Sequence, residues 1–188
     1  MIKAVITDFD GTLVDTFIAN LRAYQQAFCE CGLVLTADQY RLCYGLRFDA
    51  FMSRMAVFDN KTICKIKELK KDYYPHYFKH LVPNHTLIDI VDTLHHLGVK
   101  TAIASTARSE NLSNAITALG LQRYFDVIYA GDDVKRGKPD PEIYIMAMHN
   151  LGVSPEQTLI FEDSDIGIRA AMASGAKHIR VTHEWFEK

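Results

Sequence analysis

Several features that would define other classes of protein are missing from this sequence. No apolar run approaches the roughly 20 residues that cross a bilayer, so no membrane segment is predicted. A basic excess is also missing, because the net charge is -2 with a pI near 6.4, which argues against a nucleic-acid partner. The N-terminal stretch MIKAVITDFDGT is too briefly apolar for a signal peptide. The four cysteines form no CxxC pair, which favours reduced thiols in a cytoplasmic protein over a zinc site.

A regular alternation of strand-like and helix-like segments is present over much of the chain. From about Pro83 onward, short apolar runs alternate with segments whose apolar residues recur at helical spacing. Strict alternation predicts parallel strands joined by crossover helices, that is, an α/β fold with a doubly wound parallel sheet. Residues 2–7 form another apolar run, which we expect to supply the first strand of the same sheet.

The region between that first strand and Pro83 has a different character. Residues 15–82 favour helices throughout, with no expected strand, and include a capping box at Thr36 and Gln39. We therefore predict a helical cap domain at residues 15–82, inserted into a core of residues 1–14 and 83–188. Within the cap, the charged stretch KIKELKKD at residues 65–72 indicates a solvent-exposed helix face.

Two carboxylates stand where the first strand ends, in the stretch VITDFDGTLVDT. Asp8 and Asp10 are two residues apart, so on a strand their side chains lie on one face. Such a pair repels itself unless a cation compensates, and Mg²⁺ prefers carboxylate oxygens together with substrate phosphate. Either residue alone also suits a turn or a cap.

Polar side chains also follow the other predicted strands. Ser105 and Thr106 end one apolar run, Glu162 and Asp163 end another, and Lys138 precedes a helix. Ligands of open parallel sheets bind outside the carboxyl ends of the strands, so these groups are expected at one edge. Singly, each could be a helix cap, a turn residue or a surface charge. Together they predict a site for a phosphate ester and Mg²⁺.

Four stretches carry a family resemblance: DFDGTLVDT, IAST, GKPDPEIY and FEDSDIGIRAA. In this order they resemble the four motifs of the haloacid dehalogenase superfamily. The helical insertion resembles the cap of the subgroup that includes phosphoglycolate phosphatase and β-phosphoglucomutase.

The resemblance implies a role for each matching residue. Asp8 would be the nucleophile that forms an aspartyl-phosphate, and Asp10 the general acid and then the base. Ser105 and Lys138 would bind phosphoryl oxygens, with Thr106 beside them as a further substrate-binding residue. The metal ligands would be Asp8, the backbone carbonyl of Asp10, Asp163 and, directly or through water, Glu162.

Hydrolysis is favoured over the rival reactions of this family. Because Asp10 is present, phosphoryl transfer is expected instead of carbon–halogen cleavage. Asn20 occupies the position where the mutase has a histidine, which favours a phosphatase over a phosphosugar mutase. An inorganic pyrophosphatase and a non-catalytic regulatory protein that binds a phosphometabolite are two further functions that suit these motifs.

Substrate contacts outside the motifs are less well defined by the sequence. Asn20, Arg47 and Arg108 are candidates, while Lys70 and Lys71 have less support. The expected partner is a small phosphorylated metabolite, such as a sugar phosphate. A covered active site needs no second chain, so a monomer is expected.

Overall fold

A five-stranded parallel sheet with the order β5-β4-β1-β6-β7 forms the centre of the molecule. The computed structural model describes residues 1–186. The strands are β1 (Ala4–Thr7), β4 (Lys100–Ala104), β5 (Val127–Tyr129), β6 (Thr158–Glu162) and β7 (Lys177–Arg180). The first strand lies in the middle, paired in parallel with β4 on one side and β6 on the other. The predicted doubly wound α/β fold is confirmed.

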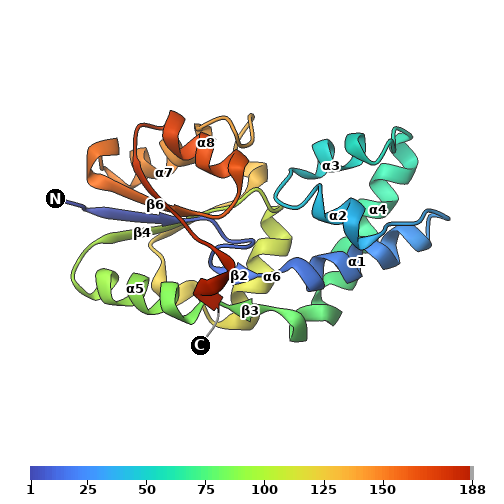
Figure 1. The fold of residues 1–188 in the computed structure, drawn as a ribbon, viewed down its shortest axis with the longest axis horizontal. Coiled ribbons are helices and arrows are strands. Elements are labelled where there is room, and N and C mark those ends of the chain that lie inside the picture. Colours follow the sequence, from blue (N-terminus) through green and yellow to red (C-terminus); the bar gives the residue numbers. More distant parts are fainter. Residues whose placement is uncertain (187–188) are drawn as a thin grey trace.

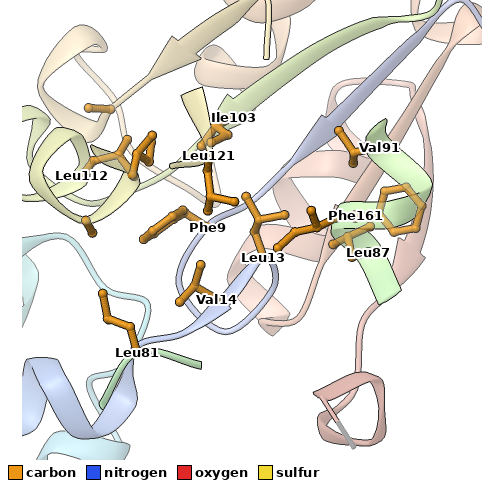
Figure 2. Close-up of a cluster of buried hydrophobic side chains, with 14 of the residues drawn as sticks. Phe9, Leu13, Val14, Leu81, Leu87, Val91, Ile103, Leu112, Leu121 and Phe161 are labelled. Carbon is orange, nitrogen blue, oxygen red and sulfur yellow. The ribbon is translucent and has the colours of Figure 1, made fainter. Parts of the chain in front are cut away.

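Helices cover both faces of this sheet (Figure 1). On one face lie α5 (His85–His96) and α6 (Ser109–Leu119), and on the other α7 (Glu142–Leu151) and α8 (Asp165–Ala173). Alternate residues of β1 serve the two faces, because Val5 packs in the first cluster and Ile6 in the second. Figure 2 shows Phe9 and Leu13 in the first cluster, beside Ile103 and Phe161. The loop after β1 is therefore held in place by the packing of its apolar side chains in the first cluster.

The predicted helical region lies at one end of the sheet (Figure 1). It consists of α1 (Phe17–Cys29), α2 (Ala37–Arg41), α3 (Phe48–Arg54), α4 (Asn60–Tyr73) and the 3₁₀ helix η1 (Tyr74–His80). We call these residues, 17–80, the helical lobe. The lobe has a buried apolar cluster of its own, which includes Phe28, Phe51 and Ile66. A separate core is what an inserted domain requires, although the division at residues 15 and 82 itself stays a prediction.

The chain passes between the sheet and the lobe twice, and the two connecting segments pair with each other as short strands. Strands β2 (Val14–Asp15) and β3 (Val82–Pro83) pair antiparallel. The expectation of no strand before Pro83 is therefore wrong at this point. Two-residue strands are too short to show an apolar alternation, so the sequence carries no periodic signal for them.

Local signals at the helix ends are mostly confirmed. Thr36 and Gln39 form the predicted capping box of α2. Helix α7 has Pro141 at its cap position, and the Asp140 carboxylate accepts from the backbone N–H of Glu142 at 3.0 Å. No helix in the described part of the chain, residues 1–186, combines the length and the apolar character needed to cross a membrane.

Candidate active site

Three neighbouring strands end at the same edge of the sheet, and the predicted residues follow them. Asp8 comes directly after β1, Ser105 directly after β4, and Asp163 directly after β6. Because β4 and β6 flank β1, the three residues are neighbours across the sheet edge. The sheet order thus brings together residues that are far apart in the sequence.

Lys138 completes this group from the loop before α7. Its ammonium donates to Asp8 Oδ1 at 2.6 Å and to Glu162 Oε1 at 2.7 Å. All three side chains are buried, with the Lys138 side chain only 2% exposed. One cation is therefore held between two carboxylates in a site that excludes bulk water.

Each charged group of this triad affects the protonation of the others. Burial opposes the positive charge of Lys138, but Asp8 and Glu162 outweigh it and hold the pKa of Lys138 well above its usual value. Burial raises the pKa of Asp8; Lys138 opposes this rise, while the neighbouring carboxylates of Glu162, Asp163 and Asp10 add to it. The site thus carries more negative charge than its one lysine neutralises.

Asp10 faces a cavity and is held there by three donors. Thr16 Oγ1 donates to Asp10 Oδ1, and Asn20 Nδ2 donates to the same oxygen at 3.1 Å. Ser105 Oγ donates to Asp10 Oδ2 at 3.3 Å. Thr16 itself contacts the Tyr44 hydroxyl at 2.9 Å. Both oxygens of Asp10 are therefore oriented by side chains from the helical lobe, from the residue between β2 and α1, and from the sheet edge.

Asp163 lies against the turn that follows β1. Thr12 Oγ1 donates to Asp163 Oδ1 at 2.9 Å. A Cβ atom at Gly11, whose φ is +91°, would stand 2.3 Å from Asp163 Oδ2, so the turn leaves room for this carboxylate only with glycine there. Burial, together with the charge of Glu162, raises the pKa of Asp163 to about 6.

The carboxylates of Asp8 and Asp163 suit a magnesium ion as ligands. Asp8 and Asp163 provide carboxylate oxygens in a region of excess negative charge, as hard divalent cations prefer. Within residues 1–186, no group of three or more His, Cys, Asp or Glu side chains has an arrangement that could hold a metal. The predicted set needs only two carboxylates, since its third ligand is the backbone carbonyl of Asp10.

Glu162 has protein partners at both oxygens. Lys138 and the Tyr144 hydroxyl contact Oε1, at 2.7 and 3.3 Å, while the backbone N–H and hydroxyl of Ser164 contact Oε2, at 2.8 and 3.0 Å. A Cβ at Gly167 would lie 1.6 Å from Glu162 Oε1, so α8 approaches this carboxylate closely. Glu162 therefore positions Lys138 and the start of α8, and its role as a metal ligand, directly or through water, stays a prediction.

A cavity of about 60 Å³ lies between the helical lobe and the sheet edge. Asp10 lines it together with Asn20, Thr106 and Arg108, which are three of the expected substrate-binding residues. Arg47 is not among the lining residues. Its guanidinium contacts the backbone carbonyls of the Val134–Lys135 pair at 3.4 Å, and its side chain packs on Gly137, next to Lys138.

The wall of this cavity includes Lys70, a candidate with less support from the sequence, and several residues that the sequence did not single out. The interpretation of residues 65–72 as a solvent-exposed face is wrong at Lys70, which is 4% exposed. Its ammonium lies 3.7 Å from the ring centroid of Tyr74 and 5.3 Å from that of Tyr24. Burial lowers the pKa of Lys70 to about 7. The sequence does indicate that Lys70 faces inward, because Ile66, Lys70 and Tyr74 follow one another at intervals of four residues and are all buried.

The remaining lining residues, which the sequence did not single out, include several aromatic side chains and one amide. The amide is Asn111, at the start of α6. Further lining residues are Tyr24, Tyr40, Tyr44, Phe48, Phe51 and Tyr74. Lys71, by contrast, is at the surface, where it pairs with Glu68 and Glu110.

Comparison with known proteins places this site in a family. The family model of the haloacid dehalogenase-like hydrolases matches residues 5–181. A phosphorylated carbohydrates phosphatase of Thermotoga maritima is 32% identical over 183 residues, covering 94% of this chain and 83% of the relative. The fructose-1-phosphate phosphatase of Escherichia coli is 28% identical, covering 94% of this chain and 95% of the relative.

A solved structure agrees with these matches. The crystal structure of CbbY from Rhodobacter sphaeroides in complex with phosphate superimposes with a TM-score of 0.89 at 27% identity, covering 98% of this chain and 88% of that one. The predicted class of enzyme, a phosphatase-type hydrolase, is confirmed by the family match and by these relatives. The chain belongs to the haloacid dehalogenase-like hydrolase family.

Proposed function

We propose that this protein is a Mg²⁺-dependent phosphatase that hydrolyses a small phosphate monoester, such as a sugar phosphate, through an aspartyl-phosphate. The observation that carries the proposal is the convergence of Asp8, Lys138, Ser105 and Asp163 at one sheet edge, beside a cavity lined by Asp10. Relatives that act on phosphorylated carbohydrates support the substrate class.

Asp8 and Asp10 divide the chemistry between them. The carboxylate of Asp8 attacks phosphorus, the bond from phosphorus to the leaving oxygen breaks, and Asp10 gives that oxygen its proton. Asp10 then takes a proton from the water that hydrolyses the aspartyl-phosphate. Its hydrogen bonds with Thr16, Asn20 and Ser105 hold it toward the cavity for both steps.

Lys138 and Ser105 stabilise the negative charge that develops on the phosphoryl oxygens. Lys138 stays protonated because two carboxylates flank it. Because bulk water is excluded from the site, water does not screen the attraction between this ammonium and a phosphoryl oxygen. Bound between Asp8, Asp163 and the Asp10 carbonyl, Mg²⁺ would shield the attacking carboxylate from the charge of the phosphate.

The helical lobe acts in this scheme as a cap that opens and closes. A cavity of about 60 Å³ is far below the ~300–1,000 Å³ typical of small-molecule sites, so substrate entry requires the lobe to separate from the sheet edge. The short ladder of β2 and β3, where both chain crossings lie, is the place for the hinge.

The test is release of inorganic phosphate from p-nitrophenyl phosphate and a panel of sugar phosphates, with Mg²⁺ and with EDTA. We expect Mg²⁺-dependent release by the wild type and none by Asp8→Asn. Isomerised phosphosugar without free phosphate would favour the mutase, and turnover of pyrophosphate alone the pyrophosphatase. A wild type that binds phosphosugars but is as inert as Asp8→Asn would favour a regulatory protein.

A further inference from the structure

Two polar atoms in the wall of the cavity are buried without a hydrogen-bond partner. They are the Nε of Arg108 and the Oδ1 of Asn111. The Asn111 side chain belongs to a residue that is only 6% exposed. An amide oxygen left unsatisfied in such a place destabilises the folded state, so an apolar residue would serve the fold better.

The two atoms belong to residues near the start of one helix. Arg108 is the N-cap residue of α6 and Asn111 lies in its first turn, three residues later. Both residues line the cavity that Asp10 lines. An N–H donor and a carbonyl acceptor without partners thus belong to two residues of this cavity wall.

The position of Asp10 shows which part of a substrate would meet this pair. Asp10 must reach the leaving oxygen to protonate it, so the group attached to that oxygen occupies the cavity of Asp10. Arg108 and Asn111 line this cavity and are therefore placed to contact the leaving group and not the phosphoryl group.

We propose that Asn111, together with Arg108, is a specificity determinant that recognises a hydroxyl group on the leaving group. A hydroxyl both donates and accepts hydrogen bonds, so it can donate to Asn111 Oδ1 or accept from Arg108 Nε. The preferred substrates are then phosphate esters of polyhydroxylated molecules, and aryl or deoxy esters are poor substrates. This inference rests on the proposed phosphatase function and narrows its substrate class.

The discrimination should be large. A site built to hydrogen-bond a substrate hydroxyl rejects the analogue that lacks it by up to about 10⁴–10⁵-fold, because its buried polar groups stay unpaired. A purely apolar pocket would discriminate much less. The amide of Asn111 therefore matters more for selectivity than the aromatic residues that surround it.

The experiment compares Asn111→Leu, which keeps the branched shape of the side chain and removes the amide, with Asn114→Leu, an exposed position on the same helix. The readout is the ratio of kcat/KM for the best of glucose 6-phosphate, fructose 1-phosphate and ribose 5-phosphate to that for p-nitrophenyl phosphate, which has no hydroxyl. We expect this ratio to fall about 10- to 100-fold in Asn111→Leu, in line with the cost of unpaired buried groups. In Asn114→Leu it should stay within about twofold.

Each outcome bears on a defined claim. An unchanged ratio in Asn111→Leu, or an equal loss on both substrates, would overturn the specificity role. A wild type that hydrolyses p-nitrophenyl phosphate but no sugar phosphate would overturn it too, and the phosphatase proposal would stand. A wild type inert on all of them would remove the phosphatase proposal itself. Asn111→Ala, measured in parallel, gives the same readout should the leucine variant not fold.

Discussion

Removal of the Lys138 ammonium is the perturbation whose effect on stability the structure defines most closely. In Lys138→Met the side chain keeps its length, but Asp8 and Glu162 lose the cation that each contacts, at 2.6 and 2.7 Å. Both carboxylates are buried, with side-chain exposures of 7% and 1%, so water cannot replace the lost partner. Breaking a buried ion pair by removing one partner costs about 3–5 kcal/mol.

This loss should depend on pH in a predictable direction. Without Lys138, burial and mutual repulsion raise the pKa of Asp8 further above its value in the unfolded chain. A carboxyl whose pKa is raised by folding binds more protons in the folded state, so it destabilises at high pH and the penalty fades as the pH falls. The difference in unfolding free energy between variant and wild type should therefore shrink from pH 8 to pH 5.

Urea unfolding followed by the fluorescence of Trp185 is the assay. Trp185 is the single tryptophan of the chain, and its ring centroid lies 6.0 Å from that of Phe161 in the core. A cost of about 3–5 kcal/mol corresponds to a fall in Tm of about 6–20 °C for a chain of this size. Lys135→Met, an exposed lysine on the same loop, should change stability by no more than about 0.5 kcal/mol. A loss below about 1 kcal/mol for Lys138→Met, or one that grows as the pH falls, would refute the reasoning.

Three further predictions concern other parts of the molecule. Gly11→Ala should lose about 1–3 kcal/mol more in urea unfolding than Gly32→Ala, because both have positive φ but only Gly11 faces Asp163; equal losses would contradict the close approach. Lys70→Met should raise the urea midpoint at pH 6, where the buried ammonium is charged and its pKa is about 7, and the gain should shrink toward pH 10, whereas Lys71→Met should show neither effect. Ile103→Ala should cost about 2–5 kcal/mol through the cavity left in the first apolar cluster, and a smaller cost in the same assay would mean that the core collapses around it.

The fold and the sheet-edge residues were predictable because their signals are local. A buried parallel strand is a short apolar run, and a polar residue directly after it, such as Asp8 or Ser105, must stand at the carboxyl edge. The order of the four family motifs along the chain then indicates which of these edge residues lie close together in the fold. None of this depends on how side chains pack.

The cavity wall was less predictable because it depends on packing between distant segments. Lys70 lies in a charged stretch, and only the neighbouring positions Ile66 and Tyr74 indicate that its side chain faces inward. Asn111 looks like an ordinary polar residue of α6, and it matters only because the helical lobe closes over it. The ladder of β2 and β3 was missed for the reverse reason, since two residues give no pattern.

The central claim is that Asp8 attacks phosphorus, and covalent labelling tests it most directly. The wild type, turning over a sugar phosphate with Mg²⁺, is quenched in acid and its peptides are analysed by mass spectrometry. The account predicts a phosphoryl group on Asp8 in the wild type and no labelled peptide in Asp8→Asn. Phosphorylation of a different residue, or phosphate release by Asp8→Asn at the wild-type rate, would contradict it.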